Sequence, residues 1–191
     1  MRSGRLLPSE TMAHGPRHYA DIRLNISGDS SRDERMRRFV DALWEAFGDD
    51  EPSKRYPAPF SWVGFYLGPG ESFEGTTASA EEMILAHRLN KPACSPIGLH
   101  GACGRAYLER GALVVADVAR LGEKYIACDP RDRSELVVPL LNEDGAPWGV
   151  LDVDSFQTEA FGEHDVWELW RLLMQARLVS EDAPLPSVRL I

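Results

Sequence analysis

Three cysteines, all beside residues that favour loops, are the side chains of this sequence best suited to redox chemistry. Cys94 and Cys103 bracket the stretch SPIGLHGA, and Cys128 lies in YIACDPRDRSE. Cysteines buried as small apolar side chains more often sit inside periodic apolar runs, so burial is the less favoured interpretation. Thiols in loops can meet, so that one attacks an oxidised sulfur atom and another resolves the product as a disulfide.

A zinc site is the competing interpretation of the cysteines. A structural zinc site takes four ligands, often with paired spacing such as CxxC, and the sequence contains no CxxC pair. An odd, low number of cysteines also argues against a framework of structural disulfides. Redox chemistry without a bound metal is therefore the favoured interpretation.

Three carboxylates on predicted strands form a second candidate group. Asp152 and Asp154 are two positions apart, so they share one face of a strand, and Leu151 and Val153 share the other. A third acid, Glu135, begins the strand that precedes them. Acids near apolar residues are costly to bury unless they meet a cation, such as the α-ammonium of a free amino acid. A protonated acid could instead donate to an oxygen atom, and a solvated sheet face is the alternative.

Two aromatic residues are candidates for an apolar wall beside these groups. Trp62 and Tyr66 are four positions apart on a predicted strand and therefore share a face. Aromatic rings contact thioether sulfur and methyl groups favourably. Packing in the core is the alternative role for both residues.

Hydrophobic periodicity predicts the elements that must position these groups. A helix begins near Arg32, with apolar residues at helical spacing, and a hairpin turn is expected at residues 142–145. Further helices are predicted at 101–109 and 163–177, and strands at 61–67, 83–89, 113–117, 135–141 and 148–154. Residues 71–80 and 118–133 are expected to be loops. The pattern favours an α+β domain with one central sheet and helices against it, spanning residues 31–180. Residues 1–30 are expected to be a flexible extension, and residues 181–191 a loose tail.

Composition and charge narrow the class of protein. The 191 residues include 30 acidic and 21 basic side chains, which gives a formal net charge of −9. This balance disfavours nucleic acid or an anionic membrane as a general partner. No apolar run approaches the roughly 20 residues that span a bilayer, and the N-terminal stretch lacks the apolar segment of a signal peptide. We therefore expect a cytoplasmic location.

Five short strings occur in a characteristic order along the chain: SWVGFYL, PAC followed by GACG, YIACD, SELVVPL and GVLDVDS. Together they resemble the free methionine-R-sulfoxide reductases, which are GAF-domain enzymes. GVLDVDS alone is typical of many GAF domains, whereas all three cysteines in register with the other strings make the match specific. The resemblance covers roughly residues 62–165 and implies a single α+β GAF-like domain, with a central antiparallel sheet flanked by helices.

The resemblance also implies roles for the cysteines. Cys128 matches the nucleophile that attacks the sulfoxide sulfur, and Cys94 matches the resolving cysteine that closes a disulfide. Cys103 matches a further cysteine with a catalytic or secondary role. The spacing between Cys94 and Cys103 is one residue shorter than the family pattern, and residues 71–90 form a longer stretch, so the cysteine pairing stays open.

The remaining candidates match the substrate-binding residues of the family. Glu135, Asp152 and Asp154 match the acids that hold the amino group and assist the sulfoxide oxygen. Trp62 and Tyr66 match the aromatic wall around the substrate methyl group. The resemblance further implies thioredoxin as the reductant, no bound cofactor, and a homodimer as one possible assembly. A GAF module that senses a small molecule, or a redox sensor, is the alternative function.

Overall fold

A seven-stranded sheet forms the centre of the computed structural model, which describes residues 16–49, 59–122 and 129–191. Its strand order is β5-β4-β1-β8-β7-β6-β9. Neighbouring strands run antiparallel except for β6 and β9, which are parallel. The strands are β1 (Trp62–Leu67), β4 (Glu82–Leu89), β5 (Ile97–Gly98), β6 (Gly111–Val115), β7 (Ser134–Leu141), β8 (Pro147–Ser155) and β9 (Ser187–Leu190).

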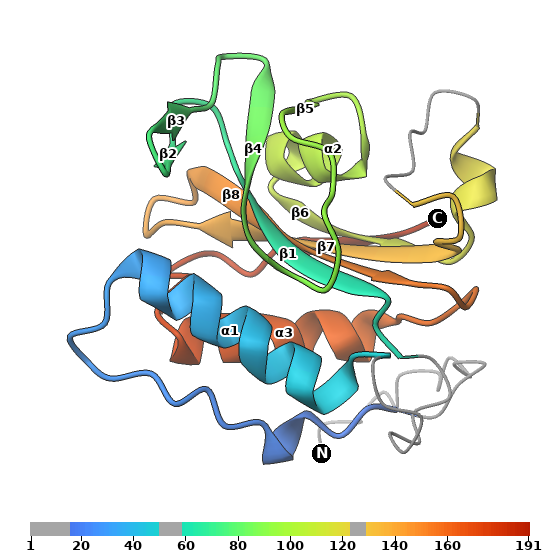
Figure 1. Ribbon diagram of the computed structural model, residues 1–191, viewed down its shortest axis with the longest axis horizontal. Helices are drawn as coiled ribbons and strands as arrows, with labels where there is room; N and C mark the ends of the chain where they lie inside the picture. Colours follow the sequence, from blue (N-terminus) through green and yellow to red (C-terminus); the bar gives the residue numbers. More distant parts are fainter. Residues whose placement is uncertain (1–15, 50–58, 123–128) are drawn as a thin grey trace, which may run out of the picture.

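Helices cover both faces of this sheet. Helices α1 (Arg32–Phe47) and α3 (Glu163–Gln175) lie on one face, whereas α2 (Ala102–Glu109) lies on the other (Figure 1). A separate small hairpin pairs β2 (Ser72–Phe73) with β3 (Thr76–Thr77). No helix among the described residues is long and apolar enough to cross a membrane. The predicted α+β class with helices against a central sheet is confirmed.

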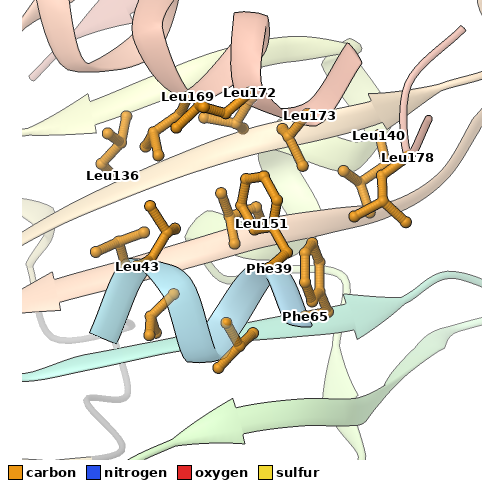
Figure 2. Close-up of a cluster of buried hydrophobic side chains, with 14 of the residues drawn as sticks. Phe39, Leu43, Phe65, Leu136, Leu140, Leu151, Leu169, Leu172, Leu173 and Leu178 are labelled. Atoms are coloured by element: carbon orange, nitrogen blue, oxygen red, sulfur yellow. The ribbon is translucent and has the colours of Figure 1, made fainter. Parts of the chain in front are cut away.

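The main core lies between the sheet and helices α1 and α3. The helices form because apolar side chains recur at helical spacing, and Ser31 caps α1 by accepting a hydrogen bond from the backbone N–H of Glu34 at 3.1 Å. Side chains from α1, α3 and the strands β1, β7 and β8 meet in this core (Figure 2). The labelled members are Phe39, Leu43, Phe65, Leu136, Leu140, Leu151, Leu169, Leu172, Leu173 and Leu178. This dense layer fixes the strands that carry the acids.

A smaller second core fills the face of the sheet under α2. Along β8, Leu151 and Val153 belong to the main core, whereas Val150 belongs to the second core. The alternation of a strand therefore directs Asp152 and Asp154 to the α2 side, as the sequence pattern predicts. Members of the second core include Trp62, Tyr66, Met83, Cys103, Leu113, Val137 and Val150.

The predicted helices and strands all occur, with small shifts at their ends. Residues 71–80, expected to be a loop, contain β2 and β3, and residues 97–98 form the short strand β5. A 3-10 turn, Val118–Leu121, interrupts the loop that follows β6. The expected loose tail is wrong for its last part, because β9 pairs with β6 along Gly111–Val114. The backbone N–H of Ala116 also donates to the carbonyl of Ile191 at 2.8 Å.

Residues 16–30 dock against the domain, where the sequence pattern predicts a flexible extension. Arg17 and Tyr19 are buried, and both bind the fully buried carboxylate of Asp165 on α3. The Arg17 guanidinium donates to that carboxylate at 2.9 Å and also lies 4.9 Å from the ring centres of Phe60 and Phe161. These contacts link distant parts of the chain, so local periodicity does not reveal them.

Candidate functional site

A cavity of about 300 Å³ opens between the sheet, the start of α2 and the loop that carries Cys94. Its volume lies at the lower end of the range for small-molecule pockets, roughly 300–1,000 Å³. Four acids line it: Asp132, Glu135, Asp152 and Asp154. The other lining residues are Tyr66, Cys94, Pro96, Ile97, Gly98, His100, Gly101, Ala102 and Cys103.

Strand register places the predicted acids and aromatics side by side. In the antiparallel sheet, Asp154 of β8 stands opposite Trp62 of β1 and opposite Glu135 of β7. Two residues further along β8, Asp152 stands opposite Gly64 and Val137. Opposed residues in antiparallel strands share a face, so the three acids form one cluster beneath α2.

Cys103 lies over this cluster at the first turn of α2. Its side chain is buried, and its thiol donates a hydrogen bond to Asp152 Oδ2 at 3.2 Å. Close approach of the helix depends on Gly104, where a methyl group would lie 2.3 Å from the backbone of Leu99. The sequence pattern suggested that Cys103 is a loop cysteine, whereas the structure buries it in the second core.

Burial controls the protonation of this cluster. Loss of solvent raises the pKa of the Cys103 thiol well above its ordinary value, and the nearby charges of Asp152, Glu135 and Asp154 add to the rise. Burial likewise raises the pKa of Asp152 to about 7, against the lowering effect of the Cys103 hydrogen bond. The pKa of Asp154 is also raised well above its ordinary value, by burial first and then by Asp152 and Glu135. The cluster therefore holds protons at a pH where ordinary carboxyl groups are ionised.

Cys94 also lines the cavity and is exposed. Its loop is held to the sheet because the Tyr66 hydroxyl donates to the Cys94 carbonyl at 2.9 Å. The backbone N–H of Leu85 also donates to the hydroxyl of Ser95 at 3.0 Å. Cys94 and Cys103 are both free thiols that line one cavity.

The aromatic pair is buried in the second core, and only one member lines the main cavity. Tyr66 faces that cavity, whereas Trp62 borders a small adjoining recess. Their ring centres are 6.0 Å apart. A methyl group on Gly64 would lie 2.4 Å from Trp62 Cη2, so this glycine makes room for the indole ring. Both rings therefore pack in the second core, and each also lines a cavity: Tyr66 the main cavity and Trp62 the recess.

Cys128 lies outside the described residues. The residue that follows it in the sequence, Asp129, is buried and accepts hydrogen bonds from Arg131 and from Lys91. The Arg131 and Lys91 hydrogen bonds lower the pKa of Asp129 well below its ordinary value. Lys91 also borders the recess beside Trp62, and its carbonyl accepts from Trp62 Nε1 at 3.0 Å.

Sequence reasoning missed two charged residues of the site. Asp132 lines the cavity and accepts a 2.7 Å hydrogen bond from the hydroxyl of Ser61. Lys91 Nζ lies 3.8 Å from Asp132 Oδ1. Both residues occupy irregular segments, where no periodicity marks a face. The proximity of Asp132 to Cys128 in sequence was the one available signal for it.

Chemically, the cavity combines features that suit a small, partly cationic ligand. It offers carboxylates of mixed protonation state, which can bind an ammonium group or donate a proton to an oxygen atom. It also offers two thiols of different exposure. Aromatic and apolar surfaces border these polar groups.

A profile of the GAF domain family matches residues 29–179. The chain therefore belongs to the GAF domain family. Within that family, as the short sequence strings indicate, it is similar to the free methionine-R-sulfoxide reductases. The Saccharomyces cerevisiae protein of that name is 34% identical over 125 residues, which are 64% of this chain and 61% of that protein. The alignment thus spans less than two thirds of the yeast protein.

Solved structures extend the similarity to the fold. The Neisseria meningitidis free methionine-R-sulfoxide reductase, solved in complex with its substrate, is 33% identical with a TM-score of 0.63, and the match covers 81% of this chain and 79% of that one. The reduced Staphylococcus aureus enzyme is 27% identical with a TM-score of 0.67, and the match covers 91% of this chain and 100% of that one. The resemblance inferred from the sequence is confirmed at both levels.

Proposed function

We propose that this chain is an oxidoreductase that reduces free methionine-R-sulfoxide to methionine with its own thiols. The observation that carries the proposal is the cluster of Glu135, Asp152 and Asp154 beneath Cys103, in a cavity of about 300 Å³. The similarity to named free methionine-R-sulfoxide reductases supports the same reaction.

The acids account for a preference for the free amino acid. An α-ammonium group can pair with Glu135 and with an ionised neighbour, which offsets the cost of burying those carboxylates. A methionine sulfoxide inside a peptide carries no α-ammonium group. It therefore forfeits this interaction and adds chain on both sides, in a cavity with room for one small molecule.

The raised pKa values account for activation of the sulfoxide oxygen. Asp152, with a pKa of about 7, and Asp154, with a pKa raised well above its ordinary value, keep a proton available near neutral pH. A protonated carboxyl group donates to the sulfoxide oxygen and makes the sulfur atom more electrophilic. Tyr66 and Trp62 then supply the apolar surface for the substrate methyl group.

Cys128 is the proposed nucleophile. Its thiolate attacks the sulfoxide sulfur, the S–O bond breaks, and the acid supplies a proton to the departing oxygen. The attack leaves a transient S–S bond between Cys128 and the substrate sulfur. Water then attacks the Cys128 sulfur, the S–S bond breaks, and a proton is released. The products are methionine and a sulfenic acid on Cys128, so the cysteine sulfur loses the two electrons that the substrate sulfur gains. The residue after Cys128 in the sequence, Asp129, binds Lys91, which borders the recess beside Trp62.

Cys94 or Cys103 completes the cycle by attacking the sulfenic acid, which gives a disulfide and releases water. The exposure of Cys94 favours it for this step, because the buried Cys103 has a strongly raised pKa. Thioredoxin regenerates both thiols by exchange if the disulfide is more oxidising than roughly −270 mV. Such recycling suits a reducing compartment, in keeping with the expected cytoplasmic location. A homodimer stays a prediction.

The test is NADPH consumption in the presence of thioredoxin and thioredoxin reductase, with each epimer of methionine sulfoxide supplied free and within a peptide. We expect turnover only with the free R epimer, and none in Cys128→Ser. Equal rates with the peptide-bound sulfoxide would refute the proposal. Full activity of Cys128→Ser would reassign the nucleophile.

Thiol counting separates this enzyme from the alternative of a sensor. A reductase loses two thiols for each free methionine formed when the sulfoxide is added without reductant. A small-molecule sensor loses none, and a redox sensor loses them with peroxide but needs no sulfoxide.

A further inference from the structure

Three potential metal-ligand atoms converge from three different elements of the fold. Cys103 Sγ of α2 and carboxylate oxygens of Glu135 on β7 and Asp152 on β8 all lie within 4.8 Å of one another. All three residues are buried and line the main cavity. Their separation in sequence hides this grouping from any search for paired spacing, which is why the sequence alone gave no indication of it.

We propose that Cys103, Glu135 and Asp152 form an inhibitory site for a divalent cation that prefers sulfur ligands, such as Zn²⁺. One thiolate and two carboxylates form a donor set that zinc accepts, with bonds of roughly 2.0–2.3 Å. Zinc would leave a fourth position for water, as it does in sites with three protein ligands.

A separate observation points to a ligand at this place. Asp152 is 6% exposed, and its Oδ1 atom has no hydrogen-bond partner among the residues that the structure describes. Its other oxygen, Oδ2, accepts the bond from the Cys103 thiol. A buried carboxylate oxygen without a partner is costly, so a cation or donor that satisfies it gains binding energy.

Charge and ligand softness define the class of cation. The four acids that line the cavity include Asp132 and Asp154, and no Lys or Arg of the described residues lines it, so the cavity favours a positive ion over an anion. A sulfur donor selects zinc-like ions over Mg²⁺ and Ca²⁺, which take oxygen ligands. On binding, the Cys103 proton leaves to solvent and sulfur takes its place in the coordination shell.

The consequence for activity rests on the proposed function. The carboxylates that would bind the metal are those proposed to bind the substrate ammonium group. Zinc and methionine sulfoxide should therefore exclude one another, and zinc should raise the apparent KM for the sulfoxide in a way that a chelator reverses.

The experiment uses the reduced full chain, freed of metal with a chelator, and Co²⁺ as a spectroscopic substitute for zinc. We expect Co²⁺ to give a sulfur-to-cobalt charge-transfer band in the near ultraviolet, and Zn²⁺ to abolish it. Cys103→Ser should remove the band. Glu135→Gln should weaken cobalt binding by at least about tenfold, since even partners outside the ligand shell are worth roughly 10–100-fold in metal affinity.

Cys94→Ser is the matched control, because this thiol is exposed and outside the ligand trio. It should keep the band unchanged. Circular dichroism spectra and melting curves of the variants check that each one folds. A band that persists in Cys103→Ser, or cobalt binding without any band, would overturn the proposal.

The two proposals fail separately. Cobalt binding is read without turnover, so a protein inactive toward methionine sulfoxide can still show the Cys103-dependent band. An active reductase that binds neither Co²⁺ nor Zn²⁺ would remove the metal site and leave the proposed function in place. Free methionine sulfoxide that fails to displace Co²⁺ would show that the two ligands do not share the acids, and would refute the inhibitory role.

Discussion

The Cys103 thiol donates a hydrogen bond to Asp152 Oδ2 at 3.2 Å, across the interface between α2 and β8. The bond joins the two sides of the cavity, because α2 covers the sheet and β8 lies within it. Both groups are buried, and both have raised pKa values. At neutral pH Cys103 is therefore a protonated thiol that donates a hydrogen bond to Asp152. A protonated thiol is a much weaker nucleophile than a thiolate.

Asp152→Asn should change the pH dependence of stability. Burial raises the pKa of Asp152 from 3.8 to about 7, so the folded protein keeps a proton that the unfolded chain releases above pH 4. Raising the pH from about 4 to about 7 therefore weakens the folded state. We expect the variant to be more stable than the parent at pH 8, by up to about 4 kcal/mol at 1.36 kcal/mol per pKa unit. The gain should vanish near pH 4.

Urea unfolding of the chelator-treated protein at both pH values measures this effect. The control is Glu143→Gln, because Glu143 is exposed in the hairpin turn and should show the same stability difference at both pH values. A gain in Asp152→Asn that is equal at pH 4 and pH 8 would contradict the assigned pKa.

Tyr66→Phe should slow the proposed formation of the disulfide by Cys94 more than the proposed reduction of the sulfoxide. The lost hydroxyl donates to the Cys94 carbonyl at 2.9 Å and holds the loop that presents the Cys94 thiol. We expect a stability loss of about 1 kcal/mol and slower disulfide formation, with methionine release less affected. Single-turnover quenching, followed by thiol and methionine analysis, separates the two rates. Tyr107→Phe is the control, since Tyr107 lies on α2 beside Gly68 and does not line the cavity.

Gly104→Ala should destabilise the protein far more than Gly101→Ala. A methyl group at position 104 would lie 2.3 Å from the Leu99 backbone, whereas one at position 101 meets no atom within 4 Å. Overpacking of this kind costs about 1–3 kcal/mol, and the helix must shift away from the cavity to relieve it. Thermal and urea unfolding of the two variants provide the comparison. Equal stabilities would show that α2 tolerates the displacement.

Arg17→Ala should cost about 3 kcal/mol or more, because it leaves the Asp165 carboxylate buried without its cation. Arg37→Ala is the control, since Arg37 pairs with Asp41 at the surface and should cost no more than about 0.5 kcal/mol. Denaturant unfolding measures both. A loss for Arg17→Ala as small as that for Arg37→Ala would show that residues 16–30 contribute little to folding.

Local periodicity was sufficient to predict most of the fold. The apolar stripe of α1, including Phe39 and Leu43, is buried as expected, and the alternation along β8 places Asp152 on the side opposite Leu151. Strand β9 could not be predicted, because its four residues have no local pattern and depend on pairing with β6. The docking of Arg17 likewise depends on a partner about 150 positions away in sequence.

The sequence predicts which residue types form the site better than it predicts how they are arranged in space. The acids were expected on one face, and strand register places Glu135 opposite Asp154. The burial of Cys103 was missed, because its depth depends on how closely Gly104 lets α2 approach. Lys91 and Asp132 were missed because their roles arise from the meeting of separate loops.

The alternation of β8 also bears on how the sheet assembles. A slip of β8 by one residue against β1 and β7 would turn Asp152 and Asp154 into the core between the sheet and helices α1 and α3, and would turn Leu151 and Val153 toward the cavity. There the carboxyl groups would be buried among apolar side chains without hydrogen-bond partners, at a cost of several kcal/mol each. The acids proposed for substrate binding thus also guard against mispairing during refolding, and variants that replace both with leucine should yield a mixture of misaligned products.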